Sequence, residues 1–174
     1  MVFINFPLKE IEKIFFIAPI LLVELKELHT KKIREIIDEK QIWNLPLLER
    51  DAGIEKVMAI LTARDHIWIV EKKGSRKLVG VITESDIIRL LAPARLPKYV
   101  FGKRYGISLQ HGTAKKAEDI MCRQIMKCSL DDKVGDVLMK MSNAHLRRLP
   151  VMERDEIVGE ITAHYILQIL LGKR

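Results

Sequence analysis

An internal repeat constrains this chain more than any other feature of its sequence. Residues 78–91, LVGVITESDIIRLL, are repeated as residues 157–170, IVGEITAHYILQIL, with six of the fourteen positions identical. In both copies alternating apolar residues are followed by apolar residues at helical spacing, which predicts a strand that passes directly into a helix. The chain is therefore expected to contain two similar units. They differ at one conspicuous position, since Asp86 in the first copy is Tyr165 in the second.

The repeated unit extends well beyond these fourteen residues. Each copy contains, in order, a short amphipathic segment, an extended segment, a helix, two strands and a closing helix. The two strands are joined by EKKGSRKL in the first copy, with Gly74 at its tip, and by the shorter ERDEI in the second. Such turns between apolar strands predict a β-hairpin in each copy. Strands that alternate with helices predict an α/β (α+β) fold in which helices flank small sheets.

The repeat also sets the expected domain boundaries. Residues 1–30 precede it and are predicted to be helical, with a bend at Pro19. Residues 31–92 form the first repeat and residues 114–174 the second. Residues 93–113, between the repeats, are rich in proline, glycine and basic side chains and are predicted to be a linker.

Composition narrows the class of protein. With 174 residues, of which 48% are hydrophobic, the chain can bury a sizeable core. Its net charge of +7 favours partners that carry phosphate, but 30 basic residues are interspersed with 23 acidic ones, so a solvated mixed-charge surface is an equal alternative. The abundance of Lys, Arg, Glu and Ile is a bias typical of thermophiles.

Cellular location is inferred from cysteines and hydropathy. Two cysteines provide neither a disulfide framework nor the four ligands of a structural metal site, which favours a reducing, cytoplasmic compartment. The longest apolar run, residues 14–23, is half of the roughly 20 residues that a membrane-spanning helix needs. The residues before it lack the basic leader of a secretory signal. We therefore expect a cytoplasmic protein without a membrane partner.

The ordered repeat of EDIM, a helix leading into RRLPVME, a hairpin into VGEIT and a closing helix resembles the cystathionine-beta-synthase (CBS) domain. The chain as a whole is similar to a tandem CBS pair, or Bateman module, of the stand-alone type found in prokaryotes, archaea included. One departure is Trp68, which stands where the family commonly has the proline seen here as Pro150. The resemblance implies two pseudo-symmetric repeats that meet through their sheets and leave two clefts for adenosine-containing ligands.

The segment Thr83-Glu84-Ser85-Asp86 permits two interpretations. As a capping box, Thr83 caps the helix and Asp86 satisfies free backbone donors, and Thr162 does the same in the second copy. The resemblance implies instead that Asp86 accepts hydrogen bonds from both hydroxyls of a ribose. Tyr165 cannot bind a diol in this way, and its ring is expected to fill the second cleft.

Basic residues suited to phosphate occur in the other copy. Arg147 and Arg148 precede Pro150, at positions that the family often directs at phosphates, whereas the first copy has Asp65 and His66 there. Two arginines at a strand edge are also common as surface residues, so both interpretations stay open. The ligand-binding residues that the resemblance implies are Thr83, Asp86, His66, Ile67, Arg147, Arg148 and Thr162.

These observations predict a regulatory module that binds AMP, ADP, ATP or S-adenosylmethionine and acts on an unidentified effector protein. We expect no enzyme, no catalytic residue, no cofactor and no metal, because the five histidines show no ligand spacing. The alternative is a protein that binds nucleic acid or scaffolds a partner through the basic linker. A homodimer is also expected, since CBS pairs commonly associate through their helices and residues 15–22 are too apolar to face water. The alternative is that this segment folds back over the chain's own repeats.

Overall fold

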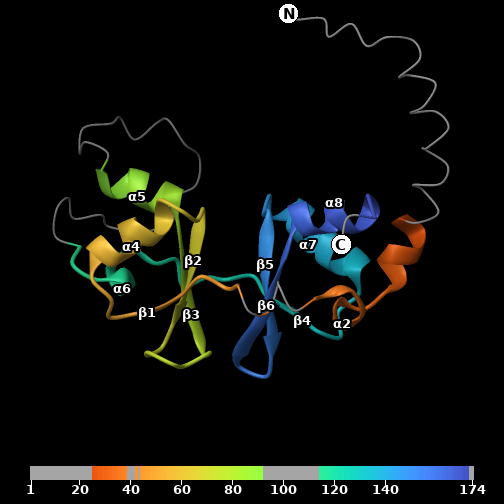
Figure 1. Cartoon of the computed structure of the whole chain (residues 1–174), viewed down its shortest axis with the longest axis horizontal. Helices are drawn as coiled ribbons and strands as arrows, with labels where there is room; N and C mark the ends of the chain where they lie inside the picture. Colours follow the sequence, from red (N-terminus) through yellow and green to blue (C-terminus); the bar gives the residue numbers. More distant parts are fainter. Residues whose placement is uncertain (1–24, 39–41, 43, 92–113, 173–174) are drawn as a thin grey trace, which may run out of the picture.

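The computed structural model describes residues 25–38, 42, 44–91 and 114–172. Two three-stranded sheets lie side by side, each flanked by helices (Figure 1), which confirms the predicted α/β fold with two repeats. Residues 25–30 are helical. The rest of the predicted N-terminal helical segment and the linker lie outside the described residues, so the dimer expected from residues 15–22 stays a prediction.

The first sheet has the strand order β1-β2-β3. β1 pairs with β2 in parallel, and β2 pairs with β3 as the predicted antiparallel hairpin. Gly74 in its turn has a φ of +77°, a conformation that glycine adopts without steric cost. The elements of this unit are β1 (Leu47–Glu49), α4 (Ile54–Leu61), β2 (His66–Val70), β3 (Leu78–Thr83) and α5 (Glu84–Leu91).

The second sheet repeats this arrangement with the order β4-β5-β6. β4 is parallel to β5, and β5 and β6 form the second hairpin. Its shorter turn places Arg154 at a φ of 55°, which is uncommon for a residue with a side chain. The elements of this unit are β4 (Cys128–Ser129), α7 (Val134–Asn143), β5 (Arg148–Glu153), β6 (Glu156–Thr162) and α8 (Ala163–Leu170).

The opening helix of each repeat packs on the other repeat. α2 (Ile33–Ile36) precedes the first sheet in the chain, yet its buried residues Ile33 and Ile36 belong to the core around α7, β5 and β6. α6 (Ala117–Ile120) precedes the second sheet, and Ile120 belongs to the core around α4, β2 and β3. Figure 1 shows α2 beside β4 and α7, and α6 beside α4. The two repeats therefore share their cores and fold as one body.

Matching backbone hydrogen bonds fix this exchange. Ile33 N donates to Asp132 O at 3.0 Å, and Val134 N donates to Lys31 O at 2.9 Å, where α2 meets the start of α7. The corresponding bonds at α6 run from Ala117 N to Ala52 O at 2.9 Å and from Ile54 N to Lys115 O at 3.0 Å. Because these bonds satisfy backbone donors at the helix starts, each core helix depends on the other repeat.

A third apolar cluster joins the two sheets to each other. It contains Trp68 and Val70 from β2, Leu78 from β3, Met152 from β5 and Ile157 from β6. All five side chains are buried, and Ile157 is fully so. This cluster holds the two hairpins face to face and fixes how the polar residues at the far ends of their strands meet.

The close approach of Gly80 to Met121 provides a test of core packing. A Cβ at Gly80 in β3 would lie 2.4 Å from Met121 Sδ and 3.0 Å from Met121 Cβ. Gly80→Ala is therefore expected to lower the free energy of unfolding by about 1 to 3 kcal/mol, measured by urea denaturation. In a Met121→Ala background, where the clashing side chain is absent, the same Gly80→Ala change should cost less. Equal stability of Gly80→Ala and wild type would contradict the packing.

Candidate functional site

The predicted site lies where the strands of the first hairpin meet the start of α5. His66, the first residue of β2, is paired with Thr83, the last residue of β3. Asp86 follows in the first turn of α5. In the second hairpin the corresponding pair is Arg148 and Thr162. Both sheets thus present their polar residues at the end away from the hairpin turns.

The ladders also define which residues of the two repeats are equivalent. Trp68 pairs with Val81 in the first hairpin, and Pro150 pairs with Glu160 in the second. Trp68 therefore takes the place of Pro150, as the alignment of the two copies predicts. By the same register, Glu160 takes the place of Val81, which puts a carboxylate where the first repeat has an apolar side chain.

Asp86 forms one of the two bonds that the capping-box interpretation predicts, since it accepts from Thr83 N, while the Thr83 hydroxyl donates to Asp86. Its Oδ2 accepts hydrogen bonds from Thr83 N and Thr83 Oγ1, both at 2.8 Å, and its residue is only 7% exposed. Its Oδ1 accepts one bond, at 3.2 Å, from the largely exposed Arg89 side chain. Because a carboxylate oxygen has two lone pairs, Oδ1 retains capacity for a further donor. The cap therefore orients Asp86 without using all of its acceptors.

The second repeat uses the equivalent position for packing. Thr162 caps α8, with Oγ1 accepting from Tyr165 N at 3.0 Å. Tyr165 is 3% exposed within the core of the second repeat, and its hydroxyl donates to Ile36 O in α2. The ring thereby ties α8 to the exchanged helix. The ring of Tyr165 occupies the position equivalent to Asp86, so only the first repeat has a carboxylate at this position.

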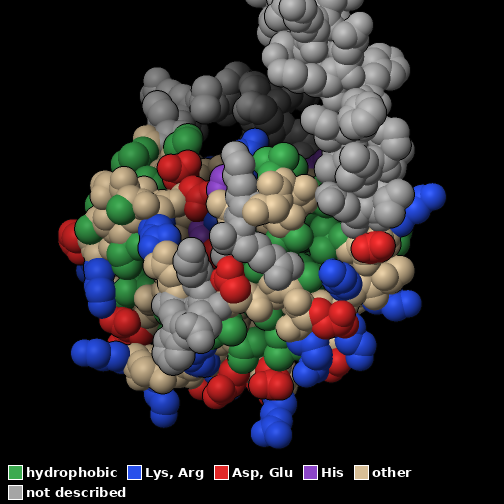
Figure 2. All heavy atoms as spheres, turned by 45° about the vertical axis from the view of Figure 1, so that its right-hand side comes forward, with side chains coloured by type: hydrophobic (Ala, Val, Ile, Leu, Met, Phe, Trp, Pro, Cys, Tyr) green, Lys and Arg blue, Asp and Glu red, His purple; other side chains and the backbone are tan. Residues whose placement is uncertain are grey.

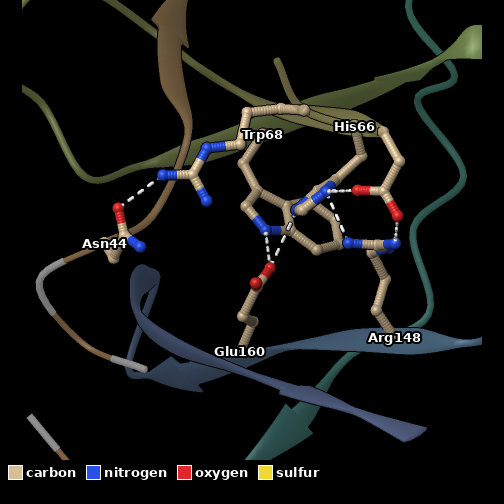
Figure 3. Close-up of polar contacts among 7 residues, drawn as sticks. Asn44, His66, Trp68, Arg148 and Glu160 are labelled. Carbon is tan, nitrogen blue, oxygen red and sulfur yellow. Dashed lines mark hydrogen bonds and ion pairs between the residues drawn. The ribbon is translucent and has the colours of Figure 1, made fainter. Parts of the chain in front are cut away.

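A network of five polar and aromatic residues crosses from one repeat to the other. We call Asp65, His66, Trp68, Arg148 and Glu160 the inter-repeat network. Glu160 reaches from β6 to His66 Nε2 and Trp68 Nε1, both at 2.8 Å from Oε2 (Figure 3). Arg148 reaches from β5 to His66 Nδ1 at 2.5 Å and donates a second bond to Asp65. The network therefore joins the polar ends of the two sheets.

The neighbours of His66 determine which hydrogen bonds its ring forms in each protonation state. A neutral ring with hydrogen on Nε2 donates to Glu160 and accepts from Arg148 at Nδ1. A protonated ring donates to Glu160 and, through Nδ1, to Asp65 at 2.9 Å, and then has no acceptor for Arg148. His66 is 3% exposed, so its ring depends on these partners in either state. The hydrogen bond to Glu160 is common to both.

The carboxylates of the network are stabilised in their charged form. Burial raises the pKa of Glu160, but the hydrogen bond and the electrostatic attraction from His66, with the hydrogen bond from Trp68, outweigh it, and the pKa lies below its ordinary value. Burial also opposes ionisation of Asp65, whose pKa is nevertheless lowered by His66 and Arg148. Both side chains are therefore anionic at neutral pH.

The structure separates the other predicted site residues. Ile67 lies between His66 and Trp68 in β2, with its side chain fully buried in the core of the first repeat on the opposite face. Arg147 precedes β5 and is exposed. His66 and Arg148 meet across the repeats. Thr83 pairs with His66 in the sheet, and Asp86 is bonded to Thr83. Ile67 and Arg147 stand apart from this group.

Glu160 was missed by inspection of the sequence, together with the roles of Asp65 and Trp68. In VGEIT the alternation of apolar and polar residues predicts a solvent-facing Glu160. A signal was nevertheless present, because the first copy has Val81 at that position and carries His66 and Trp68 on the facing strand. A charge that replaces an apolar residue in only one copy indicates a contact specific to that copy.

Other chemistry is sparse within the described part of the chain. No cluster of three or more His, Cys, Asp or Glu side chains suited to a metal occurs there. Burial raises the pKa of the Cys128 thiol to about 12, so this thiol is unreactive. Figure 2 shows Lys and Arg interspersed with Asp and Glu around one face. Among the described helices none has the length and hydropathy to cross a membrane.

The chain belongs to the CBS domain family. The family model matches it twice, over residues 33–93 and 117–172, which is most of the sequence and includes both hairpins. The two matches begin at the exchanged helices α2 and α6 and continue through α5 and α8. The tandem CBS pair predicted from the repeat is thereby confirmed.

Several solved structures share this fold. The CBS domain pair of protein MJ0100, solved with 5′-methylthioadenosine and S-adenosyl-L-methionine, is 25% identical, covers 83% of this chain and 99% of its own, and has a TM-score of 0.57. CBSX2, solved with AMP, is 18% identical with a TM-score of 0.61, covering 82% and 98%. A CBS domain-containing protein of Thermotoga maritima is 22% identical with a TM-score of 0.59, covering 84% and 98%.

Curated relatives match over shorter stretches. L-aspartate semialdehyde sulfurtransferase of Methanocaldococcus jannaschii is 30% identical over 111 residues, 63% of this chain. The match spans 18% of that protein. Homoserine O-acetyltransferase of Methanococcus vannielii is 21% identical over 77% of this chain, and the match spans 25% of that enzyme. The similarity therefore covers only a small part of either enzyme.

Proposed function

We propose that this protein is a regulatory module that senses an adenosine-containing ligand, of the AMP, ADP, ATP or S-adenosylmethionine class, in the cleft between its two CBS repeats. Ligand binding would be read by an effector protein. The observation that carries the proposal is the convergence of His66, Arg148 and Glu160 between the sheets, at the end of the first hairpin where Thr83 holds Asp86. Burial of these polar groups costs free energy that their mutual hydrogen bonds offset, and the satisfied network holds each side chain in a fixed position.

The chemistry of Asp86 supports a ribose as its partner. Two vicinal hydroxyl groups match the acceptors of one carboxylate, and charge-assisted hydrogen bonds of this type are stronger than neutral ones. Thr83 holds Oδ2 in place, so Oδ1 is presented without loss of side-chain entropy. Arg89, which is bonded to Oδ1 and largely exposed, can withdraw when the hydroxyls arrive.

The relatives support the adenosine moiety. The CBS pair of protein MJ0100 was solved with two adenosine compounds, 5′-methylthioadenosine and S-adenosyl-L-methionine. Its pair and this chain align over almost the whole of that pair. The alternative of nucleic-acid binding rests on the basic linker, residues 93–113, which lies outside the described residues. Short RNA therefore belongs in the same experiment as a competing ligand.

A thermal-shift panel tests the proposal, with 5′-methylthioadenosine, S-adenosylmethionine, AMP, ADP, ATP and a short single-stranded RNA at fixed salt. A ligand at a hundred times its dissociation constant adds about 2.7 kcal/mol to stability. We expect at least one adenosine compound to raise the melting temperature and RNA to leave it unchanged. A shift with RNA alone would favour the alternative function.

Asp86→Ala is expected to weaken binding of that compound by about a hundredfold, because two charge-assisted hydrogen bonds are lost. Isothermal titration calorimetry measures the change. The variant also loses a helix cap, at a cost of about 1 kcal/mol in stability, so a matched control is needed.

Asp119→Ala supplies that control. Asp119 accepts from Lys115 N and Lys116 N, at 2.8 and 2.9 Å, at the start of α6. It performs the same capping task in an element without a predicted ligand role. Both variants should lose similar stability, and only Asp86→Ala should lose affinity. Unchanged affinity in Asp86→Ala would refute the assignment of Asp86 to the ribose.

A further inference from the structure

Arg148, which the sequence suggests as a phosphate-binding residue, is already bonded to other residues of the protein. Arg148 donates through Nη2 to Asp65 and through Nη1 to His66, and its side chain is only 21% exposed. Asp65 is the residue before β2 in the first repeat, so this pair closes across the repeats. An anionic ligand that approaches Arg148 therefore competes with Asp65 for the charge of the guanidinium.

The surroundings of Arg148 are unfavourable to such a ligand. Glu160 lies on the other side of His66, with a side chain that is 14% exposed and anionic. At the same end of the first hairpin, α5 adds Asp86, whose own cation Arg89 is bonded to it. A phosphate beside Arg148 would therefore place its charge near Asp65 and Glu160. Like charges brought this close repel one another, most strongly at the largely buried Glu160.

We infer that Asp65 is a specificity-determining residue that makes this cleft select adenosine ligands whose 5′ group is uncharged or positively charged over those that carry a phosphate. This inference rests on the proposed function and assigns the ligand class within it. An uncharged 5′ group leaves the bond between Arg148 and Asp65 in place. A cationic one is attracted by Asp65 and Glu160, which are already fixed by their partners and need no reorganisation.

Calorimetric titration of the full chain with 5′-methylthioadenosine and with AMP, at constant pH and salt, tests the inference. Wild type is expected to bind 5′-methylthioadenosine more tightly than AMP. Asp65→Asn removes the negative charge that balances Arg148, and AMP affinity should rise at least about tenfold, the value of one charge-assisted hydrogen bond. Affinity for 5′-methylthioadenosine should stay within about threefold, since no charge of that ligand faces Asp65.

Asp155→Asn provides the matched control. It removes the same charge from an exposed residue in the turn of the second hairpin, at the opposite end from Arg148. Both affinities should be unchanged in it, which separates the local effect of Asp65 from a change in net charge. A second variant, Asp65→Ala, shows whether the amide introduced in Asp65→Asn has an effect of its own. Because the Asp65 side chain is 57% exposed, its removal should be tolerated, and the same rise in AMP affinity is expected.

The outcomes distinguish this inference from the proposed function. Tighter binding of AMP than of 5′-methylthioadenosine by wild type, or an unchanged ratio of the two affinities in Asp65→Asn, would overturn the selectivity while leaving adenosine sensing intact. Absence of binding of both compounds, in wild type and in both Asp65 variants, would overturn the selectivity, and the proposed function falls with it if S-adenosylmethionine, ADP and ATP also give no thermal shift.

Discussion

Replacing Ile33 with alanine is expected to lower the free energy of unfolding by about 3 to 4 kcal/mol, the usual cost of a large cavity in a core. Ile33 is fully buried, in a helix of only four residues that precedes the first repeat in the chain. Its neighbours, however, are core residues of the second repeat such as Val134 and Val137. The cavity therefore opens in the second repeat.

Hydrogen exchange locates the effect of Ile33→Ala. Backbone amides of β5 and β6 should lose protection before those of β2 and β3, because α2 covers the second sheet. Ile88→Ala in α5 is the control, since Ile88 is 66% exposed and its truncation should change stability by less than about 0.5 kcal/mol. Earlier loss of protection in β2 and β3 would show that α2 packs on its own repeat.

Replacing Glu160 with alanine is expected to cost about 2 to 3 kcal/mol, because it leaves His66 Nε2 and Trp68 Nε1 without their acceptor in the interior. Glu160→Gln retains one acceptor oxygen at the same place and should cost about 1 kcal/mol. Glu156→Ala, in the same strand but exposed, should leave stability nearly unchanged. Urea denaturation at neutral pH measures all three. Equal stability of Glu160→Ala and Glu156→Ala would contradict the contacts of Glu160.

Lowering the pH should reduce the free energy of unfolding of the wild type by part of the amount that Glu160→Ala loses. The pKa of Glu160 is below its ordinary value of 4.5 in the folded protein, so the unfolded chain binds the proton more readily. The contribution of Glu160 is therefore complete above that value and disappears as the pH falls through the lower, folded pKa. Glu160→Gln lacks this titration, and the stability difference between it and wild type should shrink over that range. A constant difference would contradict an ionised Glu160.

The sequence predicted the units of the fold because their signals are local. Alternation in residues 78–83 and 157–162, with Gly74 in one turn, determines each hairpin, and hence the register that pairs Thr83 with His66. The capping role of Asp86 was likewise predictable from its distance of three residues from Thr83. Both follow from residues that lie close together in the chain.

The exchange of α2 and α6 could not be predicted in this way. Ile33 and Ile120 are apolar residues of short helices, and either core would accept them. The path of the chain between the two sheets decides which core each of these residues joins. The same holds for Glu160, whose partners His66 and Trp68 are more than 90 residues away. Contacts of this kind leave no period in the sequence, so neither interpretation of Arg148, as a phosphate-binding residue or as a surface residue, includes its bond to Asp65.

A crystal structure of the protein grown with the adenosine compound that gives the largest thermal shift would test adenosine sensing most directly. The predicted result is a nucleoside between the two sheets, with its ribose hydroxyls within hydrogen-bond distance of Asp86 Oδ1 and the bond between Arg148 and Asp65 retained. A nucleoside bound away from Asp86 and the inter-repeat network, or crystals without bound nucleoside at saturating concentration, would contradict it.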